Sequence, residues 1–80
     1  MTINANALPY TLSANGTIIV QVGDNATSGT RTVLVNDEEL CRLSVVNNGY
    51  NSISFNAQSG DKIDFDYRSW GKVVFIPFIN

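Results

Sequence analysis

The stretch SISFNAQSGDKIDFDYR, residues 52–68, decides the fold class of this 80-residue chain. In its last seven residues apolar and charged side chains alternate, so that Ile63, Phe65 and Tyr67 fall on one face of an extended strand. SISFNA alternates in the same manner. A period of two is typical of antiparallel strands that pack one face on a core and leave the other in water. The stretch therefore predicts two such strands joined by a turn at AQSGD, where Gly60 supplies a positive φ angle.

The rest of the chain continues this pattern. Clusters of Gly, Asn, Asp and Ser recur about every 8–12 residues, and the runs between them are rich in Val, Ile, Phe, Tyr and Thr. No window shows the i, i+3, i+4, i+7 spacing of an amphipathic helix. We expect strands at residues 10–13, 17–22, 31–36, 40–46, 52–57, 62–68 and 72–79. They predict an all-β fold, a small antiparallel β-sandwich or jelly-roll-like barrel of about seven short strands over residues 10–80, after an extended N-terminal arm at 1–9.

Two turns carry strong local signals. Asn48-Gly49 can take the positive φ angles of a type I′ hairpin turn, and it stands between two β-rich runs. In VLVNDEEL, residues 33–40, Asn36 and Asp37 suit a turn between two strands. Both sites predict antiparallel neighbours.

The C-terminal stretch KVVFIPFIN, residues 72–80, breaks the alternation. As a strand it places Val74, Ile76 and Phe78 on the face opposite to another set of apolar side chains, so neither face is polar. Ile19 interrupts TIIVQV in the same way. Leaving such side chains wet forgoes roughly 1.5–3 kcal/mol each and creates a patch that soluble monomers avoid. Burial against another subunit is the simplest explanation.

The alternative is coverage by the chain itself, because Leu8, Pro9 and Tyr10 could fold over the last strand. The size of the chain favours association. A single domain of this length buries about 60–65% of the surface of its unfolded chain, which makes its core marginal. Cys41 is the only cysteine and histidine is absent, so neither an internal disulfide nor a tetrahedral zinc site can stabilise it. An oligomer is the remaining remedy.

Charge and hydropathy argue against two classes of partner, nucleic acids and membranes. The net charge is −2, and the five basic residues are scattered, so we expect no nucleic-acid partner. No stretch approaches the roughly 18 apolar residues that span a bilayer, so we expect no membrane partner. The first ten residues lack the basic and apolar regions of a signal peptide. Synthesis in the cytoplasm fits the unpaired thiol.

No set of residues predicts catalysis. Without histidine, Ser-His-Asp and Cys-His systems are excluded. Cys41 lies inside a predicted strand, where a free cysteine is usually a small buried hydrophobe. Asp64 and Asp66 share a strand face at about 6.5–7 Å, a spacing that glycosidases use. Lys62 and Arg68 flank them, which favours a solvated ladder of mixed charge. We expect no enzyme.

Metal and ligand sites rest on a few loop residues. The acidic turns around Asp24 and at residues 37–39 supply hard oxygens, but neither has the spacing of an EF-hand, so we expect no metal and no cofactor. Trp70 stands in the tight turn SWG beside Tyr67. These two rings and Tyr50 are candidate contacts for a sugar or a partner, although a lone tryptophan more often packs over the end of its own sandwich.

Three blocks, VLVNDEEL, SISFNAQSGDKIDF and KVVFIPF, resemble a recurring pattern in small β-sandwich modules of bacteriophage virions. Those modules, in head fibres, decoration proteins and tail-fibre tips, often run V-x-V-N-G-x-x-[LV], then S-I-S-F-x-V-x-x-G-D-x-[IVY], then an aromatic-rich strand. The resemblance covers about residues 33–79, and Asp37 replaces the usual glycine. The matching residues are Val33, Val35, Asn36, Ser52, Ile53, Ser54, Phe55, Gly60, Asp61, Ile63, Phe75, Pro77 and Phe78.

The resemblance implies a non-enzymatic virion structural protein, a homotrimer packed around a threefold axis that decorates a capsid or forms a head fibre or fibre tip. Its partners would be its own copies, the capsid shell and other virion proteins, and a host surface glycan. The alternative is a carbohydrate- or host-receptor-binding module. The candidate subunit interface consists of Val74, Ile76, Phe78 and Ile19, and the candidate shell-docking arm presents Ile3, Leu8 and Pro9.

Overall fold

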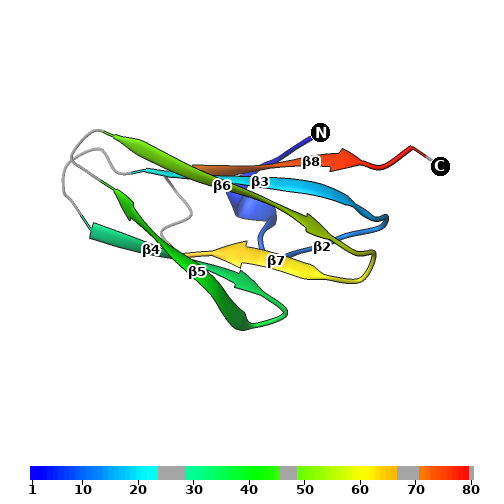
Figure 1. The fold of residues 1–80 in the computed structure, drawn as a ribbon, viewed down its shortest axis with the longest axis horizontal. Helices are drawn as coiled ribbons and strands as arrows, with labels where there is room; N and C mark the ends of the chain where they lie inside the picture. Colours follow the sequence, from blue (N-terminus) through cyan, green and yellow to red (C-terminus); the bar gives the residue numbers. More distant parts are fainter. Residues whose placement is uncertain (24–28, 46–48, 67–70, 80) are drawn as a thin grey trace.

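The computed structural model describes residues 1–23, 29–45, 49–66 and 71–79. Two four-stranded antiparallel sheets pack face to face as a small β-sandwich, as the alternating pattern predicted (Figure 1). The first sheet has the order β1-β8-β3-β6, with β1 at Thr2–Ile3, β8 at Gly71–Pro77, β3 at Gly16–Gly23 and β6 at Tyr50–Ala57. The second has the order β2-β7-β4-β5, with β2 at Tyr10–Thr11, β7 at Lys62–Phe65, β4 at Gly29–Val35 and β5 at Glu38–Val45.

The core lies between the sheets and is built by alternate residues of each strand. Ile63 and Phe65 of β7 are buried while Asp64 between them is not, which confirms the inward face predicted for KIDF. The buried hydrophobic residues are Ile3, Leu8, Leu12, Ile18, Val20, Val22, Val33, Val45, Ala57, Ile63, Phe65, Val73 and Phe75. Gly71 lets the Phe65 ring approach β8, because a Cβ there would come within 2.7 Å of that ring. Position 71 therefore needs glycine for packing.

Two predicted turns are observed. Asn36 and Asp37 both have positive φ, 55° and 67°, which gives the β4–β5 hairpin the backbone of a type I′ turn. Gly60 has a φ of 92°, as expected for the turn between β6 and β7. The predicted turn at Asn48-Gly49 falls partly on residue 48, which lies outside the described residues.

The N-terminal segment differs from the expected arm. Ile3 is buried in the core, and β1 pairs with β8 with Ile3 opposite Val73. A short 3₁₀ helix, η1 at Ala5–Ala7, then leads to the buried Leu8. Ile3 and Leu8 are therefore core residues and are not free to dock on a shell, whereas Pro9 is exposed. Two apolar residues in a polar stretch carry no periodicity, which is why the pattern suggested a separate arm.

The two turns are joined to each other by side chains. Asn36 Nδ2 donates to Asp61 Oδ1 at 3.1 Å, and Asn36 Oδ1 accepts from the backbone N–H of Lys62 at 2.9 Å. Asp61 Oδ2 also accepts from the N–H of Gln58 at 2.9 Å. The β4–β5 and β6–β7 turns are thereby held together at one end of the second sheet.

We expect Asn36→Ala to lower the free energy of unfolding by about 2 kcal/mol, since alanine loses the two side-chain bonds and tolerates positive φ poorly. Asn36→Gly loses the same bonds but accepts the backbone angle, so it should cost about 1 kcal/mol less than alanine. Urea denaturation of the three proteins measures both values. Equal stability of the alanine and glycine variants would contradict the strained turn.

Asp61 should make stability dependent on acid. Hydrogen bonds from the Gln58 N–H and then from Asn36 hold the pKa of Asp61 below its ordinary value. The folded state therefore favours the carboxylate, and this contribution is present above about pH 3.9 and is lost as the pH falls through the lower folded pKa. Asp61→Asn should be less stable than the unsubstituted protein at pH 7, and the difference should shrink at pH 3. A difference that stays constant with pH would refute this role.

Candidate functional site

β8 is hydrogen-bonded on both sides, and its side chains alternate between an inward and an outward face. The Met1 amine donates to Phe75 O at 2.9 Å, and Phe75 N–H donates to Met1 O at 2.8 Å, so β8 is bonded to the N-terminal segment on one side. Its other side pairs with β3, where Val74 lies opposite Ile19. The strand is thus interior to the sheet. Val73 and Phe75 point into the core, and the even-numbered residues point outward.

Apolar side chains gather on this outward face. Val74 and Ile19 are direct cross-strand neighbours and are half-buried, while Ile76 is 50% exposed and Phe78 is 46% exposed. Ile76 lies opposite Thr17, two residues along β3 from Ile19, a diagonal within reach of long side chains. We call Ile19, Val74, Ile76 and Phe78 the outer patch. All four were predicted as interface residues. The structure brings Ile19, Val74 and Ile76 to one face of one sheet, and Phe78 follows directly after the end of β8.

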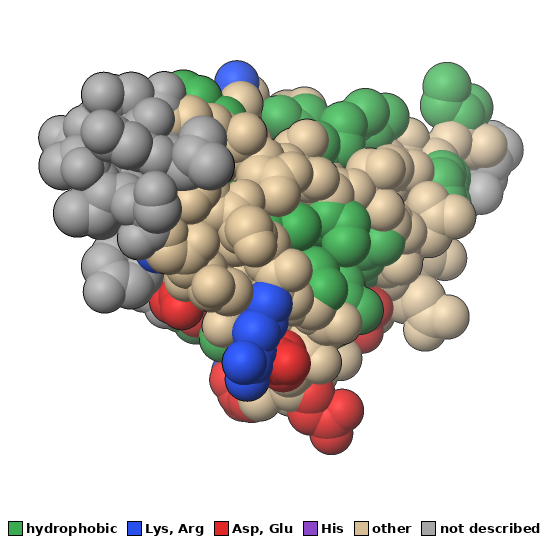
Figure 2. All heavy atoms as spheres, turned by 60° about the vertical axis from the view of Figure 1, so that its left-hand side comes forward, with side chains coloured by type: hydrophobic (Ala, Val, Ile, Leu, Met, Phe, Trp, Pro, Cys, Tyr) green, Lys and Arg blue, Asp and Glu red, His purple; other side chains and the backbone are tan. Residues whose placement is uncertain are grey.

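No described element lies over the outer patch. Figure 2 shows hydrophobic side chains at the surface along the upper rim, at the upper right and in the middle of the view. Leu8 and Tyr10, which could have covered the second face of the last strand, are engaged elsewhere: Leu8 is in the core and Tyr10 pairs with Ile63 of the other sheet. Phe78 borders a shallow hollow with Asn15, Asn56, Ala57 and Gln58. Within the described residues, the chain therefore leaves this face uncovered.

The predicted aromatic contacts are only partly placed. Tyr50 is 57% exposed at the start of β6, opposite Gly23. Its ring rests on the backbone of Gly23, where a Cβ would come within 2.6 Å of Tyr50 Cδ1. Tyr67 and Trp70 lie outside the described residues. Of the three rings, the structure therefore places one, Tyr50, which packs against a glycine.

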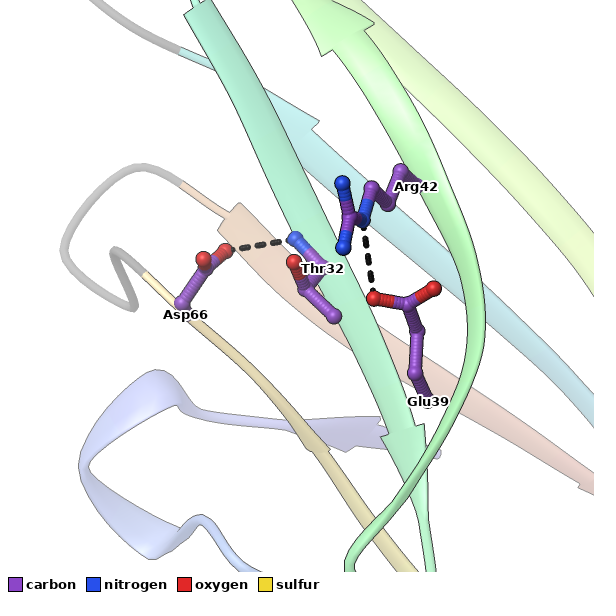
Figure 3. A network of polar contacts seen from close by, with 4 residues as sticks. All are labelled: Thr32, Glu39, Arg42 and Asp66. Atoms are coloured by element: carbon purple, nitrogen blue, oxygen red, sulfur yellow. Dashed lines mark hydrogen bonds and ion pairs between the residues drawn. The ribbon is translucent and has the colours of Figure 1, made fainter.

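The paired carboxylates serve the backbone. Asp66 Oδ1 accepts from the N–H of Thr32 at 2.7 Å, and Asp64 Oδ1 accepts from the N–H of Phe65 at 2.8 Å. Figure 3 shows Asp66 beside β4 and the separate ion pair of Arg42 with Glu39, whose atoms lie 2.8 Å apart. Lys62 reaches Asp37 at 2.7 Å rather than either carboxylate. Asp64 and Asp66 thus each accept a hydrogen bond from a backbone N–H group.

The Cys41 thiol lies beside Glu39 of the acidic turn at residues 37–39, whereas the turn around Asp24 lies outside the described residues. Partial burial, and next the negative charge of Glu39, raise the pKa of the Cys41 thiol, which favours the protonated form. Within the described ranges, no three His, Cys, Asp or Glu side chains gather closely enough to hold a metal ion. Nor does any helix in those ranges have the length and apolar character needed to cross a membrane.

A second uncovered region was not predicted. On the side of the sandwich where β5 and β6 are in contact, Cys41, Leu43, Ile53 and Phe55 point inward but are only half-buried. The sequence does carry a signal for it: β6, YNSISFNA, alternates like a half-buried strand yet contains no charge and no proline. That signal locates an edge only when the order of the strands is known.

Comparison with known proteins gives no relative: no family model, no curated protein and no solved structure matches this chain.

Proposed function

We propose that this protein is a non-enzymatic structural component of a bacteriophage virion, a trimeric module that decorates a capsid or forms a head fibre or fibre tip. The outer patch is the observation that carries the proposal. Ile76 and Phe78 are large side chains that remain about half exposed on a sheet with no described cover. Packing the outer patch against other copies would remove this apolar surface from water at roughly 25 cal/mol per Å².

The size of the domain supports assembly. The folded chain exposes 4723 Å², and a typical specific interface covers about 800 Å² per partner. Contacts of that size would cover about one sixth of this surface. The wide, nearly uncharged outer face of β8, β3 and β6 suits such a contact, because Lys72 is the one charged residue that these strands place there within their described ranges. The resemblance of residues 33–79 to virion modules supports a role in a virus particle, and the outer patch supports contact between copies.

We expect the purified protein to be an oligomer at micromolar concentration and Ile76→Asp to weaken its association at least tenfold, because each copy would bring an unpaired charge into a dry contact. Leu40→Asp is the matched control, since Leu40 is 46% exposed on β5 of the other sheet. Light scattering coupled to size exclusion measures the mass of each variant. A monomeric unsubstituted protein, or an assembly whose mass Ile76→Asp and Phe78→Asp both leave unchanged, would contradict this interface.

One observation supports the second candidate, a carbohydrate- or receptor-binding module. Tyr50 is 57% exposed and its ring packs against Gly23, so part of a tyrosine ring is available to stack on a sugar. Such binding is compatible with a virion protein, since a fibre tip can both assemble and attach.

If Tyr50 is a stacking platform, Tyr50→Ala should reduce glycan binding at least tenfold, whereas Tyr50→Phe keeps the ring and should bind nearly as well. A glycan array with the three proteins measures this. Absence of any bound glycan, or equal binding by the alanine variant, would remove this candidate without affecting the outer patch.

A further inference from the structure

β6 is the open edge of the first sheet. All eight of its residues pair with β3 without a register shift, and no other strand of the described chain pairs with its opposite side. Natural edge strands are usually protected by charges, proline or a bulge. The neighbouring edge strand β5 has such protection, because it carries Glu38, Glu39 and Arg42 and a register shift opposite Val33 and Leu34. β6 has none of these devices.

The hydrogen-bonding phase of the sheet identifies which groups of β6 are available. In an antiparallel ladder the N–H and C=O of one residue point to the same neighbour, and successive residues point to opposite sides. Met1 and Phe75 exchange both main-chain hydrogen bonds, so the N–H and C=O of the next residue, Val74, are directed to Ile19 of β3. The N–H and C=O of Ile18 are therefore directed to the other neighbour, Phe55 of β6.

Along β6 the direction alternates again, so the N–H and C=O groups of Ser52, Ser54 and Asn56 are directed to the open edge. The Ser52 N–H supports this phase, because it is bonded to the side chain of its neighbour, Asn51 Oδ1, at 2.9 Å instead of to β3. Asn51 Nδ2 in turn donates to Ser44 O of β5 at 2.9 Å. This bridge joins the two edge strands at residue 51 and leaves residues 52–56 as the open part of the edge.

The same five residues have complementary faces. Ile53 and Phe55 point toward the half-buried Cys41 and Leu43 at the gap between the sheets, while Ser52, Ser54 and Asn56 point to the outer, wet face. Read in both directions from Ser54, the strand gives an apolar residue, then a small polar residue. A copy of this strand, turned by 180°, therefore matches it residue for residue.

We propose that β6 pairs antiparallel with β6 of a second copy of this chain across a twofold axis at Ser54. Ser54 then bonds to Ser54 of the second copy, and Ser52 pairs with Asn56 at both ends. Ile53 lies opposite Phe55 of the second copy, which covers both half-buried side chains. The absence of charge in β6 lets two copies meet without repulsion, and the two sheets become one of eight strands.

Two other axes keep the hydrogen-bonding phase but fit less well. An axis at Phe55 pairs Ser52 with Gln58, whose N–H is already bonded to Asp61 Oδ2. An axis at Ile53 places Phe55 opposite the polar Asn51, which bridges to β5. The axis at Ser54 avoids both conflicts, and it requires only that the Ser52 N–H exchange its bond to Asn51 Oδ1, on the neighbouring residue, for one to the carbonyl of Asn56 of the second copy. This contact is made by a strand edge and does not rest on the proposed role in a virion. Ser54 is the cross-strand neighbour of Ile19 in the outer patch, so the paired-charge variants at residues 52 and 56 are what separate the edge contact from the outer patch.

The test begins with Ser54→Lys, which sets two ammonium groups directly opposite each other on an exposed position that the monomer tolerates. Thr11→Lys on β2, an exposed residue at the opposite edge of the sandwich, is the matched control. Sedimentation at about 100 μM should show association of the unsubstituted protein and of Thr11→Lys, and at least tenfold weaker association for Ser54→Lys. Amides of Ser54 and Asn56 should exchange slowly in the associated form only.

Paired charges test the register. Ser52→Lys with Asn56→Asp should keep the association, because each lysine meets an aspartate of the second copy, whereas Ser52→Lys with Asn56→Lys should abolish it. Equal association of these two double variants, a monomeric unsubstituted protein, or fast exchange at Ser54 would overturn the proposal. Loss of assembly with Ile76→Asp but not with Ser54→Lys would overturn it while leaving the proposed function standing.

Discussion

The ladder between β3 and β8 determines which side chains form the core and which form the outer patch. Seven residue pairs join these strands without a break, from Gly16–Pro77 to Val22–Gly71. This register sends Val73 and Phe75 into the core together with Ile18 and Val20, and it sends Val74 and Ile76 to the opposite face beside Ile19. A slip by one residue would exchange the two sets. The core and the outer patch are therefore products of the same pairing.

Because β8 lies inside its sheet, its apolar outer face can be covered only by side-chain packing. The N-terminal segment pairs with residues 73–75 on one side of β8 and β3 pairs with the other side, so the middle of β8 is hydrogen-bonded on both sides within the chain. What remains unsatisfied on β8 is apolar area, and only side-chain packing can cover it. β6 presents the opposite case, with unpaired backbone groups and polar outward side chains. The molecule thus carries two surfaces of different kinds: a sheet face suited to side-chain contact and a strand edge suited to main-chain pairing.

Much of the fold could be predicted because alternation with period two is a local property. KIDF and SISFNA showed which side chains are buried, and Asn36, Asp37 and Gly60 showed where the chain turns. The N-terminal strand could not be predicted, since Ile3 becomes a core residue only through its pairing with Val73, 70 positions away in sequence. Short segments that are fixed by distant partners carry no periodic signal of their own.

The same distinction applies to the candidate sites. Val74, Ile76 and Phe78 could be identified from the sequence because a strand with two apolar faces contradicts the usual pattern. The open edge of β6 could not, because the order of strands in a sheet is a non-local fact. For Asp64 and Asp66 the sequence favoured a solvated ladder of charges over a catalytic pair, but it could not show that one oxygen of each accepts the N–H of Phe65 or Thr32.

If neighbouring copies cover the outer patch, its side chains are dry in the assembled protein. Hydroxyl-radical labelling, read residue by residue by mass spectrometry, measures this, with Leu40 as the internal reference of nearly equal exposure in the single chain. Once each rate is divided by the intrinsic reactivity of its side chain, Ile76 and Phe78 should be labelled several times more slowly than Leu40. Similar normalised rates for all three would mean that the outer patch remains in water, and that neighbouring copies do not cover it.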